Sequence, residues 1–296
     1  MQGIILLNKP KGITSFSAVA RVRRLCGIKR VGHTGTLDPL AEGVLPILVG
    51  RATALSSYIT DGDKAYTARV RLGITTDTED ITGTVLEEKE VSISGEALEN
   101  AVSSFKGKIM QVPPMYSAVK VNGKKLYELA RAGKEVEREA RKVTFHEIEI
   151  LSIELPVVKI RVLCSKGTYI RTLCNDIGEK LGCYAAMKSL LRTRVGVFDI
   201  KEAITLEELE KYRDEGKLAE VILPPDRIFM HMPAVYAKTE FCKLLDNGNT
   251  VYPNMLQKPP YLKDGTEVRM YGGEKFYGIF QYVAKDNRLK PVKMFL

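Results

Sequence analysis

Apolar and polar residues alternate along this chain with two periods, one helical and one strand-like. Apolar positions in 16–26 recur at the spacing of an α-helix, and Ser15 before them is a candidate cap. In 65–73 the side chains alternate in the manner of a β-strand. Similar patterns predict further helices near 51–59, 96–105, 169–182 and 206–213, and further strands over 143–153 and 157–164. Because these elements follow no regular βαβ order, the chain is predicted to be α+β, with a mixed, largely antiparallel sheet flanked by helices.

Two adjacent prolines mark a change of character in the chain. The segment 223–229, LPPDRIF, interrupts regular structure. The sequence beyond it is rich in turn signals and short alternating runs, namely Asn247-Gly248, Asp264-Gly265, Gly272-Gly273 and 276–283. We therefore expect a large domain over 1–228 and a small β-domain over 229–296.

A further turn signal lies inside the first of these domains. Asn122-Gly123 is typical of a tight hairpin turn, and the residues after it change to a helical periodicity that ends at Gly133. The surrounding segment, about 106–142, is therefore predicted to project as an insertion.

The composition is that of an ordinary globular protein, with 45% hydrophobic and 27% charged residues in a chain of 296. No segment reaches the ~18 apolar residues of a membrane helix, and the first residues lack the basic region of a signal peptide. We therefore expect a cytoplasmic protein. The five cysteines contain no CxxC pair and the three histidines fit no metal-binding pattern, so neither a disulfide framework nor a metal is predicted.

The formal net charge of +9 is concentrated in two segments. Eight basic side chains accompany two acidic ones in 1–54, and ten accompany four in 106–142, whereas 77–90 is acidic. Two separate basic patches suit a polyanion whose phosphates would supply affinity. Charge alone equally allows ordinary solvated helix faces.

One carboxylate, Asp38, lies in an unusual run, VGHTGTLDPLAEGVLP (31–46). The glycines permit backbone conformations closed to other residues, and Pro39 restricts Asp38 itself to extended geometry. The run therefore pins one carboxylate in a defined direction. Read locally, it favours an Asp-Pro turn whose carboxylate bonds its own backbone. A phosphate-binding loop is disfavoured because neither GxxxxGK[ST] nor GxGxxG is present.

Within this run, GHTGTLDPLAEGVLPILVG (32–50) resembles the active-site motif of the bacterial tRNA pseudouridine synthases of the TruB family, which modify position 55 in the T loop. Four more strings resemble motifs of this family in the family's order: LLNKPKGITS (6–15), DKAYTARVRLG (63–73), PPMYSAVKVNGKKLYELARAG (113–133) and CSKGTYIRTLCNDIGEKLG (164–182). The resemblance spans most of 1–228. It implies the pseudouridine synthase fold, with 106–142 as an RNA-gripping insertion.

Carried over by residue, the resemblance makes Asp38 the catalytic carboxylate, Tyr66 the aromatic that stacks on the target base, and Arg171 the ion-pair partner of Asp38. Residue chemistry agrees, because a neighbouring arginine keeps a carboxylate ionised and oriented. Without the resemblance, Tyr66 would be read as a sheet-packing aromatic and Arg171 as a solvated charge or structural salt bridge.

The resemblance also assigns substrate-binding roles to residues around these three. His33 would enter the space that the target nucleotide leaves, although alone it is read as a loop histidine. Asp80 would interact with the active-site arginine, or else be an exposed turn aspartate. The remaining assignments are Leu190 in the uracil pocket, Lys9 with Pro10 behind the pocket, and Tyr169.

The reaction implied is the isomerisation of one uridine to pseudouridine without a cofactor. The target base leaves its stack, at a cost of a few kcal/mol, before a side chain reaches it. The resemblance leaves open whether Asp38 attacks the sugar or the base. It implies the T arm of tRNA as partner, a monomer, and a PUA-type RNA-binding domain over 229–296.

Two other functions would also suit a basic protein of this kind. A non-catalytic RNA-binding or RNA-folding protein would use the same basic surface, but such a relative is expected to have lost Asp38, Tyr66 or Arg171, which are all present. An RNA methyltransferase would need a glycine-rich cofactor loop after a strand, and the sequence contains none. The enzyme is therefore the favoured interpretation.

Overall fold

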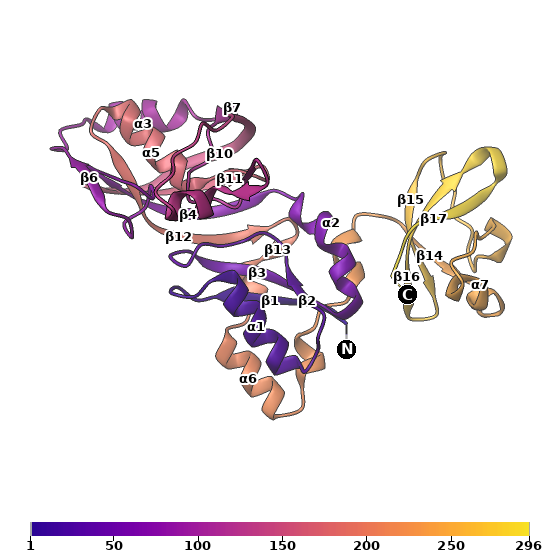
Figure 1. Cartoon of the computed structure of the whole chain (residues 1–296). Coiled ribbons are helices and arrows are strands. Elements are labelled where there is room, and N and C mark those ends of the chain that lie inside the picture. Colours follow the sequence, from indigo (N-terminus) through magenta and orange to yellow (C-terminus); the bar gives the residue numbers. More distant parts are fainter. Residues whose placement is uncertain (1, 296) are drawn as a thin grey trace.

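The computed structural model describes residues 2–295, and a mixed β-sheet organises most of the chain (Figure 1). Within the described residues this sheet has nine strands in the order β1-β3-β12-β4-β11-β10-β7, with β2 paired to β3 and β13 to β12. The strands are β1 (Gly3–Lys9), β2 (Val31–His33), β3 (Glu42–Val49), β4 (Lys64–Leu72), β7 (Gly107–Gln111), β10 (Arg141–Glu154), β11 (Val157–Cys164), β12 (Ala185–Val195) and β13 (Phe198–Asp199). Since β3 and β12 are parallel and the other pairs are antiparallel, the predicted fold class is confirmed.

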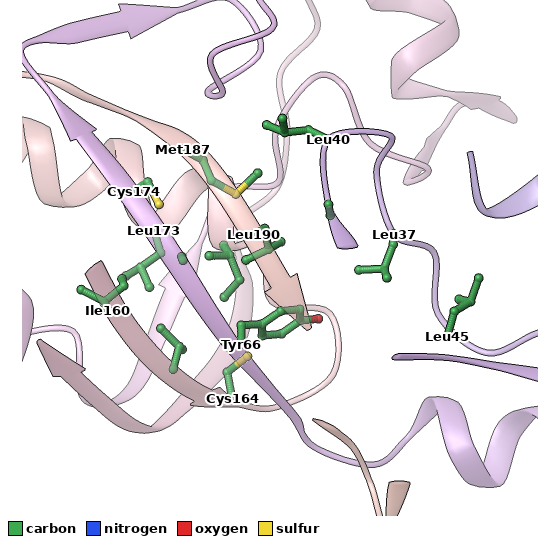
Figure 2. Packing of buried hydrophobic residues seen from close by; sticks show 14 of the residues in the cluster. Leu37, Leu40, Leu45, Tyr66, Ile160, Cys164, Leu173, Cys174, Met187 and Leu190 are labelled. Carbon is green, nitrogen blue, oxygen red and sulfur yellow. The ribbon is translucent and has the colours of Figure 1, made fainter. Parts of the chain in front are cut away.

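The larger core lies on the face of the sheet that is covered by helices. The helices of this part of the chain are α1 (Ser15–Cys26), α2 (Ser56–Thr60), α3 (Gly95–Ser103), α4 (Leu126–Arg131), α5 (Ile170–Leu181) and α6 (Leu206–Asp214). Apolar side chains of α1, α3, α5 and α6 join those of the strands in one cluster, part of which Figure 2 shows. No helix of residues 2–295 is long and apolar enough to cross a membrane.

Helices α1 and α5 are capped by residues that the local sequence does not single out. Thr14 caps α1, since its hydroxyl accepts a hydrogen bond from the backbone N–H of Ser17, so the prediction that Ser15 is the cap was wrong. Helix α5 has no side-chain cap of its own. Instead, the buried amide of Gln111 donates to the carbonyl of Tyr169 (3.0 Å) and accepts from its N–H (2.9 Å). These hydrogen bonds fix the residue at which each of the two helices begins.

Strand β12 lies in the interior of the sheet, between β3 and β4. Its Arg192 pairs in register with Gly43 on one side and with Tyr66 on the other. At Gly43, φ is +109°, and a Cβ there would lie 2.2 Å from the carbonyl oxygen of Arg192, so only glycine permits this approach. Strand β12 thus connects the Asp38 segment with the Tyr66 strand.

Two short hairpins project from the large sheet. Strands β5 (Ile74–Thr76) and β6 (Val85–Glu88) flank the loop that contains Asp80. Strands β8 (Lys120–Val121) and β9 (Lys124–Lys125) meet at Asn122 and Gly123, whose φ values are 50° and 81°. This confirms the tight turn predicted there, because both central residues of such a turn need positive φ. Helix α4 follows directly, and Gly133 comes shortly after its end.

The last part of the chain forms a second sheet, which Figure 1 shows to one side of the first. Its order is β14 (Ala234–Ala237), β15 (Glu267–Gly272), β16 (Lys275–Val283) and β17 (Arg288–Met294), and α7 (Cys242–Asp246) packs with it. It has its own hydrophobic core. An aromatic contact joins the two parts of the chain, since the Phe229 ring lies 5.0 Å from that of Tyr58 in α2 and 6.0 Å from that of Phe295.

Candidate active site

Asp38 lies in the loop between β2 and β3, and its carboxylate remains accessible, with 40% of the side chain exposed. Its backbone carbonyl accepts a hydrogen bond from the N–H of Ala41 (3.1 Å), which closes the turn. The carboxylate pairs with Arg171 from the distant helix α5. The local interpretation, a turn aspartate satisfied by its own backbone, therefore does not describe this side chain.

Arg171, in the first turn of α5, uses each nitrogen of its guanidinium for a different partner. Nε lies 3.0 Å from Oδ2 of Asp38. Nη1 donates to the carbonyl of Thr78 (2.9 Å) and Nη2 to that of Tyr116 (2.7 Å). Only 5% of the arginine side chain is exposed. Because three separate segments hold this planar group, it presents a fixed edge to Asp38.

Tyr66 lies near the start of β4 and is almost completely buried. Figure 2 shows it in the same apolar cluster as Leu37, Leu40 and Leu190. Burial raises the pKa of its hydroxyl, and Arg192 beside it acts in the opposite direction. The phenol therefore stays neutral at physiological pH and combines an apolar ring with a polar tip.

Arg192 is a buried cation that sequence reasoning missed. Only 1% of it is exposed, and it donates from Nε to the carbonyl of Val44 (2.9 Å) and from Nη2 to that of Gly35 (3.0 Å). It thereby connects β12 to both ends of the Asp38 loop. In the sequence it is one of several arginines, and nothing local indicates that it points inward.

Lys9 lies at the end of β1 and is also fully buried. Its ammonium donates to the carbonyls of Pro10 (2.8 Å) and Ile13 (2.9 Å). Burial lowers the pKa of Lys9 to about 8, although Glu42 and Asp38 act to raise it. Its ammonium therefore holds the backbone of the segment 10–13.

His33 is half-buried at the end of β2, beside the Asp38 loop. Burial lowers its pKa below the usual 6.5, and Arg192 lowers it further, so the imidazole is neutral at physiological pH. Among the described residues its Nδ1 is a buried atom without a hydrogen-bond partner. This side chain therefore retains a free polar atom next to the carboxylate loop.

The carboxylate of Asp80 is used within its own loop. Asp80 is buried, and its Oδ1 accepts hydrogen bonds from the hydroxyl of Thr78 (3.0 Å) and the N–H of Thr82 (2.9 Å). The hydrogen bonds of Asp80 thus hold the shape of its loop. Arg171 contacts this loop through the carbonyl of Thr78.

The neighbouring Glu79 was not predicted. Its Oε2 accepts a hydrogen bond from the hydroxyl of Thr172, the residue after Arg171 (2.6 Å), and its backbone has a positive φ of 63°. The other two predicted residues flank the site: Tyr169 directly precedes α5, and Leu190 is buried on β12 opposite Ala68.

Helix α5 also carries Asp176, and burial disfavours the ionised form of its carboxyl group. Burial raises the pKa of Asp176 to about 7, and the charges of Glu179 and Glu79 raise it further. A raised pKa in the folded state contributes stability below the ordinary pKa of 3.8, and this contribution is lost as the pH rises through about 7. Folding is therefore penalised by this carboxylate in alkaline solution.

We predict that Asp176→Asn, which stays uncharged, will melt at a higher temperature than the parent, with a larger difference at pH 8 than at pH 5, because the penalty from this carboxyl grows as the pH rises from 3.8 to about 7. Retained solvent contact reduces the effect, so we expect about 2–4 °C, which corresponds to about 1 kcal/mol. Thermal unfolding followed by circular dichroism at both pH values measures this. The exposed Asp214→Asn is the control, and an equal difference at both pH values would contradict the prediction.

Comparison with known proteins places this site in a family context. Residues 23–170 match the model described as TruB family pseudouridylate synthase (N terminal domain), and residues 171–230 match that of the tRNA pseudouridylate synthase B C-terminal domain. The proteins called tRNA pseudouridine synthase B from Alkaliphilus oremlandii and Clostridium kluyveri are 47% and 46% identical to this chain. The matches cover 99% of this chain and 97% of the first relative, and 100% of both chains for the second.

A solved structure, that of a Cbf5-Nop10-Gar1 complex, contains a similar chain with a TM-score of 0.73 and 27% identity, over 99% of this chain and 85% of that one. An H/ACA ribonucleoprotein bound to a substrate RNA contains another, with a TM-score of 0.74 and 24% identity, over 99% and 85% of the two chains. The second likeness concerns the fold alone.

Proposed function

Since this chain belongs to the TruB family of pseudouridylate synthases and isomerises uridine to pseudouridine in tRNA, we propose that its target is the uridine at position 55 in the T loop. The observation that carries the assignment of the site is the ion pair between Asp38 and Arg171. It combines an accessible carboxylate with an almost fully buried, rigidly held cation. This combination keeps a carboxylate ionised and aimed while a substrate can still reach it.

In the proposed reaction the bond between N1 of uracil and the sugar carbon breaks, the base turns, and C5 forms the new bond to that carbon. C5 loses a proton and N1 gains one, so the product is an isomer of the substrate. We assign to the Asp38 carboxylate the role of acting directly on the target nucleoside. No redox step or group donor is needed, so the proposed reaction requires no cofactor.

Tyr66 and Leu190 supply the apolar part of the proposed base pocket. A flipped base loses its stacking in the RNA, which costs a few kcal/mol. Stacking on an aromatic side chain returns about 1–3 kcal/mol of this. The neutral, half-buried His33 is proposed to enter the space that the base has left, because an uncharged imidazole can stack between bases without the desolvation penalty of a cation.

The basic segments 1–54 and 106–142 are proposed to contact the phosphates of the T arm. The exposed arginines of α1 and the lysines of the β8–β9 hairpin are the candidates for these contacts. Residues 1–228 would form the catalytic domain, and 229–296 a PUA-like domain that extends the contact along the tRNA. We further propose that the enzyme acts as a monomer in the cytoplasm, where its tRNA substrate is available.

The proposed target is tested by mapping pseudouridine in a tRNA transcript incubated with the purified chain and no added cofactor. Carbodiimide treatment followed by primer extension should give a new stop that reports position 55. A transcript with cytidine at position 55 is the matched control and should give no stop. A stop elsewhere would overturn the position. Tight tRNA binding without any stop would favour the non-catalytic RNA-binding or RNA-folding alternative.

A further inference from the structure

The hydroxyl of Ser15 makes a reciprocal contact with the residue that precedes Asp38. Its Oγ donates to the carbonyl of Leu37 (2.9 Å) and accepts from the N–H of Leu37 (2.8 Å). Only 1% of Ser15 is exposed, and Leu37 is also buried. One side chain therefore satisfies both backbone groups of the residue before the carboxylate, in a place that water does not reach.

The residue after Asp38 is held from the same segment. The N–H of Gly12 donates to the carbonyl of Pro39 (2.8 Å). Gly12 has a φ of +91°, a conformation that favours glycine. The segment 12–15 thus contacts the chain on both sides of Asp38, and the ammonium of Lys9 holds the start of this segment through Pro10 and Ile13.

The direction of the Asp38 side chain depends on this backbone support. The carboxylate is accessible, and its ion-pair partner Arg171 is fixed by two further contacts, to the carbonyls of Thr78 and Tyr116. The arginine cannot follow a displaced carboxylate without losing its bonds to Thr78 and Tyr116. A movement of Leu37 would therefore change the geometry between the two charged groups, and a misplacement of about 1 Å can reduce a reaction rate about 100-fold.

We propose that Ser15 is a positioning residue for Asp38, and that its hydroxyl sets the orientation of the carboxylate through the backbone of Leu37. The proposal rests on the proposed function through the role of Asp38. It is separate from the helix-capping role, which belongs to Thr14. Ser15 itself does not act on the substrate.

The test compares Ser15→Ala with Ser17→Ala. Ser17 lies on the same helix, is exposed, and its hydroxyl contacts that of Thr14 (2.8 Å) rather than the Asp38 loop. The single-turnover rate of pseudouridine formation and the dissociation constant for tRNA are measured well below the melting temperature of each variant. We expect Ser15→Ala to lower the rate about 10- to 100-fold with tRNA affinity unchanged within about threefold, and Ser17→Ala to retain the parental rate.

A crystal structure of each variant gives a second readout that does not depend on activity. We expect the separation of Arg171 Nε and Asp38 Oδ2 to increase from 3.0 Å in Ser15→Ala and to stay unchanged in Ser17→Ala. A parental rate together with an unchanged separation would overturn the proposal, as would a loss of stability without a loss of rate. If the parent itself modified no uridine at position 55, the proposed target would fail, whereas the crystallographic comparison would still decide the role of Ser15.

Discussion

Asp38→Asn will reduce pseudouridine formation by at least about 10⁴-fold while tRNA affinity stays within a few-fold of the parent. Asparagine has the size of aspartate and can remain beside Arg171, so the fold is preserved. It has neither the negative charge nor the reactive carboxylate oxygen. The arginine loses its ion-pair partner but keeps its bonds to the carbonyls of Thr78 and Tyr116, which hold it in place.

Single-turnover kinetics and filter binding measure the two quantities for Asp38→Asn separately. Glu42→Gln is the matched control, because Glu42 is the other acid of segment 1–54 and is exposed at the start of β3. It should keep the parental rate. Full activity of Asp38→Asn would remove the basis for the proposed site.

Arg171→Lys is expected to lower the rate about 10²- to 10³-fold, although the positive charge is retained. A lysine ammonium is a single point on a flexible stem. It cannot reach Asp38, Thr78 and Tyr116 in the three directions that the guanidinium uses. The carbonyls of Thr78 and Tyr116 would lose their hydrogen-bond donor. The carboxylate of Asp38 would lose the rigid guanidinium that faces it.

The effect of Arg171→Lys should appear in the single-turnover rate, with tRNA affinity changed only slightly. Arg213→Lys on the exposed side of α6 controls for the general effect of the substitution. If the arginine acts only through its charge, the lysine variant will work at nearly the parental rate. That outcome would contradict the geometric argument.

The sequence predicted well those features that depend on local periodicity or on a complete motif. Helix α5 was expected over 169–182 and spans Ile170–Leu181, because its apolar stripe and the terminal Gly182 are strong local signals. The cap of α1 was predicted wrongly because local signals alone do not distinguish two neighbouring hydroxyl residues. Thr14 and Ser15 are adjacent and both suit a cap, and only the tertiary contact with Leu37 determines which hydroxyl is left for the helix.

The burial of Arg192 could not be predicted from alternation. Strand β12 has register irregularities against β4 between Met187 and Ser189 and again between Arg192 and Arg194. Each irregularity interrupts the simple alternation of faces, so counting by twos along the sequence does not show which arginine points inward. The parallel pairing of β3 with β12 likewise depends on contacts between distant segments.

Because β12 pairs with both β3 and β4, its place in the sequence also affects when the enzyme can become active during synthesis. Strands β3 and β4 leave the ribosome early, but the strand that pairs with both consists of residues 185–195. Until it arrives, each of these strands has an unpaired edge, and such edges favour aggregation. Contacts at this sequence separation also make folding slow. The loop that contains Asp38 therefore gains its bonds from Arg192 only after residues 185–195 have been made, and a chain that ends before them would lack the strand that joins this loop to Tyr66.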